Sequence, residues 1–440
     1  MKVCILDLCC DTSRSYINSI YYVNKFKISP IEEADIICYV GCAYNKEKID
    51  KVYKHIESII SVKKDDAKVS IFGCVTKYDE FYNIVKEAYD IDYIGRGEGL
   101  KMQEELINYL NSKIDQNYFV PELGFSFRTR KRLDLVVQDG CNNRCSFCKS
   151  NYLNLRNRSV PMNALFEDFD FFIDKYGITE FNITGLNPSQ YGVDLYGSSK
   201  LADLVKRLGE NSKVKNILLD MLSIPDMNEE LLSQILTNPK IKRVMLPVQS
   251  FDNRLLNLMR RKHNAEEAEK ILTLISKERP DIFLETIFMA HYPTEDISNI
   301  QKTINFLEKG IVNNPVLSFY NYGKNVKTLY SENIKEVSEE EQNNLTMYYY
   351  KHVIPIIDQQ RKELLSKPVF GTLVEKGEKE DYFSTLYRFT TQEYSVVCPK
   401  NDDALLFEDY NLAVDFLPSL DDVLYEIEKR PGKGKIIQKI

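Results

Sequence analysis

Cys141-Asn142-Asn143-Arg144-Cys145-Ser146-Phe147-Cys148 is the stretch around which the chain is organised. It follows an apolar run, Leu133–Val137, whose pattern predicts a strand. Three cysteines spaced C-x3-C-x2-C on one tight loop can hold three irons of a [4Fe–4S] cube and leave the fourth iron open to a small molecule. The alternatives are a zinc site lacking one ligand and chance clustering, but zinc sites favour C-x2-C pairs and no second pair follows here. The stretch therefore predicts a reactive iron–sulfur cluster.

Length and composition bound the class of protein. At 440 residues the chain is too long for one ordinary core, so two or three domains are expected. Its 43% hydrophobic and 28% charged residues are typical of a globular protein, and no apolar run approaches a membrane span or a signal peptide. Ten cysteines in such a chain indicate thiolates in a reducing cytosol, so we expect a cytoplasmic location. The formal net charge of −7 disfavours a general nucleic-acid binder.

Residues 1–118 alternate apolar runs with amphipathic stretches, a pattern that predicts a parallel α/β domain. The expected strands are Lys2–Leu8, Ala34–Val40 and Val69–Gly73, and the helical stretches between them include Lys46–Val62 and Tyr78–Ala88.

A cysteine follows each of these three strands: Cys10, Cys42 and Cys74. The carboxyl ends of parallel strands share one edge of a sheet, where ligands usually bind, so the three thiols are expected to converge. Strand alternation does not choose between Cys10 and its neighbour Cys9. Cys4 and Cys38 lie within strands and are expected to be small core residues.

Residues 121–365 show six strand patterns separated by helical ones, which predicts a partial (β/α)6 barrel with its active site at the carboxyl ends of the strands. The expected strands are Leu133–Val137, Phe181–Thr184, Ile217–Met221, Arg243–Pro247, Ile282–Phe288 and Val316–Tyr320. The expected helices include Asn163–Tyr176, Lys200–Leu208, Asn228–Leu236, Ala265–Lys277 and Ile297–Glu308.

Residues 368–440 contain short β-like runs that predict a small, mostly-β domain. The runs are Phe370–Val374, Phe383–Phe389, Tyr394–Cys398, Ala404–Phe407 and Leu412–Leu417. Nine Lys and Arg stand against fourteen Asp and Glu in this segment, a net charge of −5, which disfavours a phosphate backbone and suits a polypeptide. The basic end at 429–439 is expected to be a short solvated tail.

The cysteine spacing, with the aromatic Phe147 before the third cysteine, resembles the radical S-adenosylmethionine (SAM) superfamily. Together with Cys10, Cys42 and Cys74, it resembles the radical-SAM methylthiotransferases in particular. The resemblance implies two [4Fe–4S] clusters, one on Cys141, Cys145 and Cys148 and one on the three N-terminal cysteines. It implies that SAM is cleaved at the former to a 5′-deoxyadenosyl radical, and that a sulfur at the latter is methylated by a second SAM. A strong reductant such as flavodoxin or ferredoxin is also implied. The resemblance further implies that the β-rich domain at 368–440 recognises the substrate.

Further stretches extend this resemblance over residues 1–365. Thr184-Gly185-Leu186-Asn187 is similar to the family's second-strand loop, and Leu246-Pro247-Val248-Gln249-Ser250 with Leu258-Met259-Arg260-Arg261 to its fourth-strand motif. Gly185 would let backbone approach the methionine moiety or simply end a strand. Gln249 can donate and accept at a strand end, and Arg260 can pair with the carboxylate of SAM or merely cover a helix surface. Phe147, Gly185, Gln249 and Arg260 are therefore the candidate SAM contacts.

The chain departs from the family pattern in several places. Leu8-Cys9-Cys10 replaces the usual Leu-Gly-Cys, and Ser13 stands where asparagine is common. After the third cysteine only Arg158-Ser159 of the usual basic segment is kept, and His291-Tyr292-Pro293-Thr294-Glu295 replaces a Gly-Phe-Pro-Gly-Glu sequence. His291 would be a proton donor, a substrate contact or, as we expect, a plain surface histidine.

The altered loops and the acidic balance favour a peptide or protein side chain as the substrate that receives the methylthio group. A tRNA adenosine is the alternative. Transfer of sulfur without methyl, or a non-catalytic Fe–S or zinc module, also remains open from the sequence.

Overall fold

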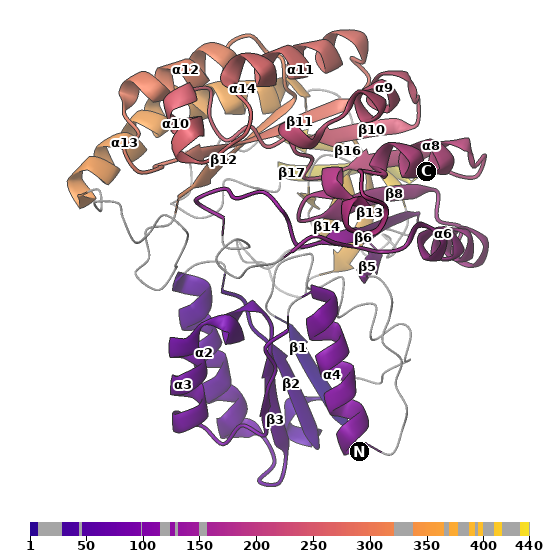
Figure 1. Ribbon diagram of the computed structural model, residues 1–440, viewed down its shortest axis with the longest axis vertical. Coiled ribbons are helices and arrows are strands. Elements are labelled where there is room, and N and C mark those ends of the chain that lie inside the picture. The colour runs from indigo at the N-terminus through magenta and orange to yellow at the C-terminus, as the bar shows by residue number, and fades with distance from the viewer. Residues whose placement is uncertain are drawn as a thin grey trace.

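The structure is a computed structural model that describes residues 1–7, 29–43, 46–97, 99–114, 124–127, 131–148, 156–320, 338–364, 369–376, 387–391, 395–398, 409–415 and 432–439. Its strands form three separate sheets in chain order (Figure 1). Cys9, Cys10 and Ser13 lie outside the described residues, as do the predicted run at 404–407 and part of the run at 383–389.

The N-terminal sheet is parallel throughout, with the order β1-β2-β3-β4. Its strands are β1 (Val3–Asp7), β2 (Ile36–Val40), β3 (Lys68–Phe72) and β4 (Tyr93–Ile94). The helices are α2 (Lys46–Val62), α3 (Asp79–Ala88) and α4 (Gly99–Lys113), with the 3-10 turns η1 (Ile31–Glu33) and η2 (Cys74–Lys77). The predicted strands and helices are confirmed; β4 and α4 were not predicted.

Side chains on this sheet alternate between two apolar layers. Ile37 and Tyr39 pack with residues of α2 and α3, whereas Cys38 and Val40 pack with residues of α4. Both helical layers are visible on either side of the sheet in Figure 1. Because strand side chains point alternately to opposite faces, a strand covered on both faces reads as a continuous apolar run. Cys4 and Cys38 are buried in these layers, as predicted.

The central sheet has the order β12-β11-β10-β9-β8-β6-β5. Its parallel strands are β6 (Arg132–Asp139), β8 (Glu180–Gly185), β9 (Asn216–Leu219), β10 (Ile241–Met245), β11 (Phe283–Ala290) and β12 (Asn314–Phe319). The predicted partial barrel is thus confirmed. Two short strands, β5 (Gly124–Phe127) and β7 (Arg158–Ser159), run antiparallel to β6 and were not predicted.

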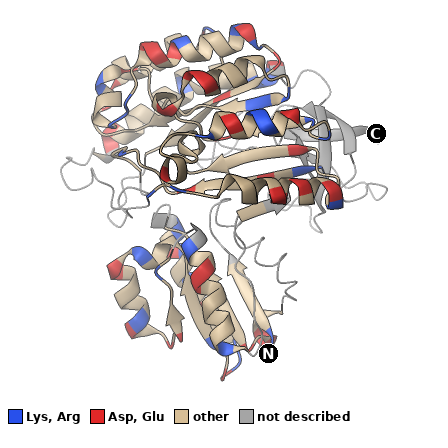
Figure 2. Cartoon of the chain, turned by 45° about the vertical axis from the view of Figure 1, so that its right-hand side comes forward, with Lys and Arg blue, Asp and Glu red and all other residues tan. Residues whose placement is uncertain are grey.

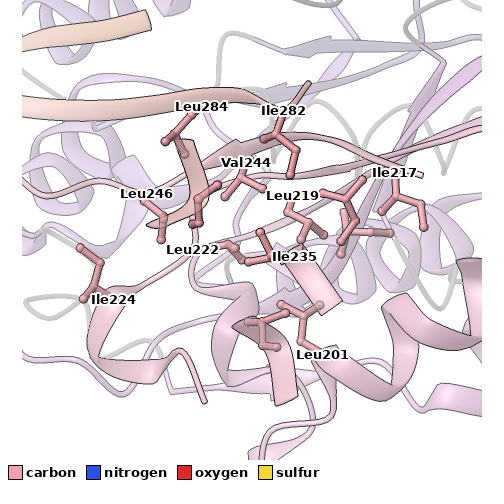
Figure 3. Packing of buried hydrophobic residues seen from close by; sticks show 14 of the residues in the cluster. Leu201, Ile217, Leu219, Leu222, Ile224, Ile235, Val244, Leu246, Ile282 and Leu284 are labelled. Carbon is pink, nitrogen blue, oxygen red and sulfur yellow. The ribbon is translucent and has the colours of Figure 1, made fainter. Parts of the chain in front are cut away.

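Helices cover one face of this sheet. They are α6 (Met162–Tyr176), α7 (Val193–Tyr196), α8 (Leu201–Glu210), α9 (Glu229–Thr237), α10 (Asn253–Leu258), α11 (Ala265–Glu278), α12 (Ile297–Leu307), α13 (Glu339–His352) and α14 (Ile354–Leu364), with the turns η3 (Pro188–Gln190) and η4 (Ile224–Asp226). Figure 3 shows Leu219, Val244 and Leu284 from neighbouring strands gathered with Leu201 of α8 and Ile235 of α9. Burying each such side chain contributes about 1.5–3 kcal/mol to stability.

The opposite face of the central sheet carries a polar network over β10, β11 and the edge strand β12. Arg243 of β10 pairs with Glu285 of β11, and Asn314 of β12 donates to the same carboxylate with a distance of 2.6 Å between Nδ2 and Oε1. Asp220 lies 3.9 Å from the Arg243 guanidinium. Charges taken out of water need such partners, so this network lets the concave face bury polar groups.

The C-terminal strands close into a barrel with the order β13-β14-β15-β17-β16. They are β13 (Val369–Lys376), β14 (Tyr387–Thr391), β15 (Ser395–Cys398), β16 (Asp409–Asp415) and β17 (Gly432–Lys439). The prediction of a solvated tail at 429–439 is wrong, because β17 pairs with both β15 and β16 and completes the barrel. Closing the barrel gives the backbone N–H and C=O groups of β17 hydrogen-bond partners on both sides. The side-chain pattern of this segment alone did not indicate a strand.

Basic and acidic side chains are interspersed along the helices of the N-terminal and central units, as Figure 2 shows. Among the helices that the structure describes, none combines the length and the apolar character needed to cross a membrane.

Candidate functional site

The Cys141–Cys148 loop leaves the carboxyl end of β6 through a sharp turn at Gly140. This residue has φ +71°, and a Cβ there would lie 1.8 Å from the carbonyl oxygen of Arg156. Only glycine permits this close backbone approach without displacing the 156–159 segment. The turn therefore delivers the cysteines directly to the edge of the sheet.

The far end of the loop is tied to the segment that follows α10. Ser146 donates its backbone N–H to the Met259 carbonyl at 3.0 Å, and its Oγ donates to the Leu258 carbonyl at 2.8 Å. The Tyr292 hydroxyl lies 2.8 Å from the same Oγ and donates to Leu258 at 3.0 Å. The buried hydroxyl pair thus joins the cysteine loop to the loops after β10 and β11.

Nitrogen donors surround two of the three thiols. Cys141 Sγ accepts from the Asn143 backbone at 3.3 Å and from Asn187 Nδ2 at 3.6 Å. Cys145, which is buried, accepts from Arg261 Nη1 at 3.4 Å. Burial raises the pKa of Cys141 to about 11, and the neighbouring Cys148 and Cys145 thiols add to the increase against the hydrogen bonds from Asn143 and Asn187. The three sulfurs are therefore close enough to influence one another's charge.

The donor set fits three ligands of an iron–sulfur cluster. Three cysteines lie on one loop, and N–H groups donate to the sulfurs of Cys141 and Cys145. Zinc needs four ligands around one ion, whereas each thiolate of a cluster binds a different iron. Hydrogen bonds from N–H groups to cluster sulfurs are a recognised feature of such sites.

Asp226, at the end of η4, holds the cysteine loop from the β9 side. Its carboxylate accepts from Asn143 Nδ2 at 2.6 Å, from Asn187 Nδ2 at 2.9 Å and from Gln190 Nε2 at 3.1 Å. Burial alone raises the pKa of Asp226, but the hydrogen bonds it accepts outweigh burial and lower the pKa below its usual value. Three loops, after β6, β8 and β9, thus meet at one carboxylate.

A second carboxylate fixes the returning chain. Asp194 in α7 accepts from Asn157 Nδ2 at 2.9 Å and from both the backbone and the Oγ of Ser159, at 2.9 and 2.6 Å. Asn157 also donates to the Gln190 carbonyl at 3.1 Å. The Arg158-Ser159 segment, the part of the family's basic segment that this chain shares, therefore binds the loop that follows β8.

The four predicted SAM contacts occupy different environments. Phe147 packs in a small apolar cluster with Leu255, Met259 and Tyr292. A Cβ on Gly185 would lie 2.3 Å from the Gln138 carbonyl oxygen, so this glycine is needed for close packing of β8 on β6. The other two candidates are Gln249, which is buried, and Arg260, which is exposed. The structure turns the neighbouring Arg261, rather than Arg260, toward the cysteines.

Non-glycine residues with a left-handed backbone mark three successive strand ends. Met221, Gln249 and His291 have φ values of 54°, 78° and 61° and follow β9, β10 and β11. Such conformations cost energy and cluster at functional sites. Gln249 is 8% exposed, and its Oε1 has no hydrogen-bond partner among the described residues. Its buried acceptor therefore suits a bound ligand better than a purely structural role.

His291 is not the surface histidine that the sequence suggested. It is 8% exposed, its Nε2 lies 3.1 Å from Thr346 Oγ1, and its ring packs edge-on against Phe319. Burial lowers the pKa of His291 to about 4. The expectation failed because α13, which covers this loop, comes from a distant part of the chain.

The N-terminal cysteines within the described residues lie on adjacent loops. Cys42 is buried just beyond β2, and Cys74 begins η2 just beyond β3. The Cys74 sulfur accepts from the Ala43 backbone at 3.1 Å. Gly73, at φ +97°, allows this approach, since a Cβ there would lie 2.6 Å from the Gly41 carbonyl oxygen. The structure thus brings two of the three predicted thiols to one edge, and Cys10 lies outside the described residues.

Sequence reasoning missed Asp226, Arg261 as a contact of Cys145, and the Ser146–Tyr292 pair. The strand-end rule that selected Cys42 and Cys74 would also have selected Asp226, which follows β9. The other two contacts join segments more than one hundred residues apart, so no local signal marks them.

Known proteins similar to this chain are radical-SAM enzymes. Residues 135–307 match the family model for the Radical SAM superfamily. The chain is 27% identical over 389 residues to the ribosomal protein uS12 methylthiotransferase RimO of Acetivibrio thermocellus, covering 83% of this chain and 84% of that one. It is 30% identical over 291 residues to the tRNA-2-methylthio-N(6)-dimethylallyladenosine synthase of Thermotoga petrophila, covering 63% of this chain and 64% of that one.

The solved structures show the same fold. The radical S-adenosylmethionine methyltransferase TsrM of Kitasatospora setae aligns with a TM-score of 0.53 at 11% identity, over 72% of this chain and 75% of that one. At this identity the likeness concerns the fold alone.

Proposed function

Because the chain belongs to the radical-SAM methylthiotransferase family as a divergent member, we propose that it attaches a methylthio group to an unactivated C–H carbon of a tRNA adenosine. The observation that carries the chemistry is the group of three thiols at the carboxyl end of β6, within the segment that matches the Radical SAM model. When bound, two [4Fe–4S] clusters and SAM would supply the reducing electron, the radical and the sulfur.

The residues of this chain would divide the work. Cys141, Cys145 and Cys148 would hold the cluster that meets SAM, and Cys10, Cys42 and Cys74 the second cluster. Phe147 and Gln249 would contact SAM from the loops after β6 and β10, with Gly185 and Arg260 as weaker candidates given their packing and exposure. Flavodoxin or ferredoxin would deliver electrons, and the enzyme would work in the cytoplasm.

The choice of tRNA differs from the preference for a peptide or protein that the acidic balance and the altered loops gave. Relatives named for tRNA substrates reach 30% identity, including the Thermotoga petrophila synthase. The threonylcarbamoyladenosine tRNA methylthiotransferase MtaB of Thermotoga maritima is 29% identical over 281 residues. These matches support tRNA at least as well as a protein. The acidic net charge does not oppose this choice, because net charge is an average over the chain and a local surface can carry the opposite sign.

A protein side chain is the second candidate. The observation that favours it is the net charge of −5 over residues 368–440, which suits a cationic polypeptide better than a phosphate backbone. The long match to the uS12 methylthiotransferase is compatible with it.

The test is anaerobic iron and sulfide counting combined with turnover. We expect about eight irons in the wild type and about four in Cys141→Ala/Cys145→Ala/Cys148→Ala, with 5′-deoxyadenosine formed only by the wild type. The matched variant Cys42→Ala/Cys74→Ala should still form 5′-deoxyadenosine but no methylthio product. SAM cleavage by the triple variant would refute the cluster assignment.

The substrate is tested by mass spectrometry after reaction with unmodified tRNA or with ribosomal protein uS12. Gain of a methylthio group on the tRNA alone supports the lead proposal. Gain on the protein alone transfers the proposal to the second candidate.

A further inference from the structure

We propose that two partly buried side chains of opposite charge, Arg261 and Asp226, set the reduction potential of the cluster on Cys141, Cys145 and Cys148 by acting in opposite directions. The inference rests on the proposed function, because it requires that these cysteines hold a redox-active cluster. It assigns both residues as positioning residues that act through the cysteine loop.

Arg261 brings a permanent positive charge to one ligand. Its Nη1 donates to Cys145 Sγ at 3.4 Å and its Nη2 to the Pro247 carbonyl at 2.7 Å. The contact with Pro247 fixes the guanidinium beside the end of β10. A guanidinium remains charged at any physiological pH, so Cys145 always faces a cation. The remaining Nε–H is buried and has no partner in the described part of the chain.

Asp226 brings a negative charge to the other side of the loop. It does not touch a cysteine directly, but it binds Asn143 and Asn187, and both of these residues donate to Cys141 Sγ. Asn187 Nδ2 lies 2.9 Å from the carboxylate and 3.6 Å from the sulfur, and its two N–H groups can serve both acceptors. Asp226 thus adds a negative charge beside the two asparagines that donate to the Cys141 sulfur.

Both effects have a defined sign. Reduction transfers one electron from an external low-potential reductant to the cluster, and no bond forms or breaks in that step. The cluster gains negative charge, which a nearby cation favours and a nearby anion opposes. Charge and hydrogen bonds at the sulfurs are established controls of cluster potential. Arg261 therefore raises the potential, and Asp226 lowers it.

The experiment is a potentiometric titration followed by electron paramagnetic resonance, without SAM. The background is the full chain carrying Cys42→Ala/Cys74→Ala, so that only the Cys141 cluster titrates. We expect Arg261→Gln to lower the midpoint potential and Asp226→Asn to raise it. Each change should be about tenfold in the reduction equilibrium, which is about 59 mV for one electron. Arg261→Lys keeps the charge and should return the potential toward that of the wild type.

Exposed neighbours provide matched controls. Lys262→Gln and Glu230→Gln remove the same charges from adjacent surface positions and should leave the potential in place. Gln190→Leu provides a second test of the Asp226 effect, independent of whether Asp226→Asn holds iron. It removes one donor to the carboxylate, together with the acceptor of the Asn142 backbone N–H, leaves that charge less neutralised, and should lower the potential.

The possible outcomes distinguish failure of the proposed function from failure of the inference about the cluster potential. A wild-type chain that holds no iron, or leaves SAM intact under strong reductant, refutes the proposed function and this inference together. A competent cluster whose potential shifts no more than in the controls, or in the same direction for both charge removals, refutes this inference alone.

Discussion

Glu295 links the loop after β11 to helix α13, and its protonation should control stability near neutral pH. Its Oε2 accepts from the His291 backbone at 2.6 Å and its Oε1 accepts from the Tyr349 hydroxyl at 2.8 Å. Burial raises the pKa of Glu295 from 4.5 to about 7, the nearby Asp296 adds to the increase, and the two hydrogen bonds oppose it. The folded protein therefore holds a proton that the unfolded chain releases.

The sign and size follow from this difference. Between pH 4.5 and 7 the folded state binds more protons at Glu295 than the unfolded state, so the contribution of Glu295 to the free energy of unfolding falls as pH rises. One pKa unit corresponds to about 1.4 kcal/mol, so the full loss amounts to about 3 kcal/mol and is complete above pH 7. His291 contributes a term of opposite sign, because burial lowers its pKa to about 4 and the folded protein keeps it neutral while the unfolded chain protonates it below about pH 6.5. This term is common to the wild type and to a Glu295 variant, so it cancels when the two are compared.

Glu295→Gln isolates the effect, because the amide reproduces the protonated acid. Its Oε1 can accept from His291 and its Nε2 can donate to the Tyr349 oxygen. Urea unfolding followed by circular dichroism at pH 5 to 8 should show wild type losing about 3 kcal/mol relative to the variant as pH rises. The exposed Glu308→Gln serves as the control and should follow the wild-type curve. Parallel curves for wild type and Glu295→Gln would refute the reasoning.

Two further predictions concern local geometry. Gly73→Ala places a Cβ 2.6 Å from the Gly41 carbonyl oxygen at φ +97°, so the Cys42 and Cys74 loops must separate. The variant should lose about half of its iron while still cleaving SAM, whereas Gly310→Ala, with φ +62° and open space around it, should keep all its iron. Asn264→Ala removes the capping box with Glu267 at the start of α11 and should cost about 1 kcal/mol in urea unfolding; no loss would show that the cap is redundant.

The elements of the fold could be predicted because their signals are local. The run Ile36–Val40 reads as a strand because both of its faces are buried, and Ala265–Glu278 reads as a helix because its buried residues recur at helical spacing. Strands that depend on a partner could not be predicted in this way. β17 is basic and rich in glycine, and only its pairing with β15 and β16 makes it a strand.

The same distinction applies to the site. Cysteine spacing is a chain property, so the Cys141–Cys148 loop could be read directly from the sequence. The charges that act on it could not, because Arg261 and Asp226 come from the loops after β10 and β9. The sequence favoured Arg260 over Arg261, and helical position alone does not separate adjacent arginines. In the structure Arg260 is exposed with a left-handed backbone, and the guanidinium of Arg261 is the one that reaches Cys145.

Gln249 has two unusual features at the sheet edge, a left-handed backbone and a buried side-chain oxygen without a partner among the described residues, and only the second suggests a ligand. Its left-handed backbone is held by two hydrogen bonds, from its own N–H to the Ile287 carbonyl and from the Met289 N–H to its carbonyl, both at 2.8 Å. These bonds fix the conformation without any ligand, so the strain alone does not argue for one. The side chain is different, because its buried Oε1 has no partner among the described residues, and such a group costs about 1–3 kcal/mol. The unsatisfied amide oxygen, and not the backbone, is therefore the feature of Gln249 that supports the proposed contact with SAM.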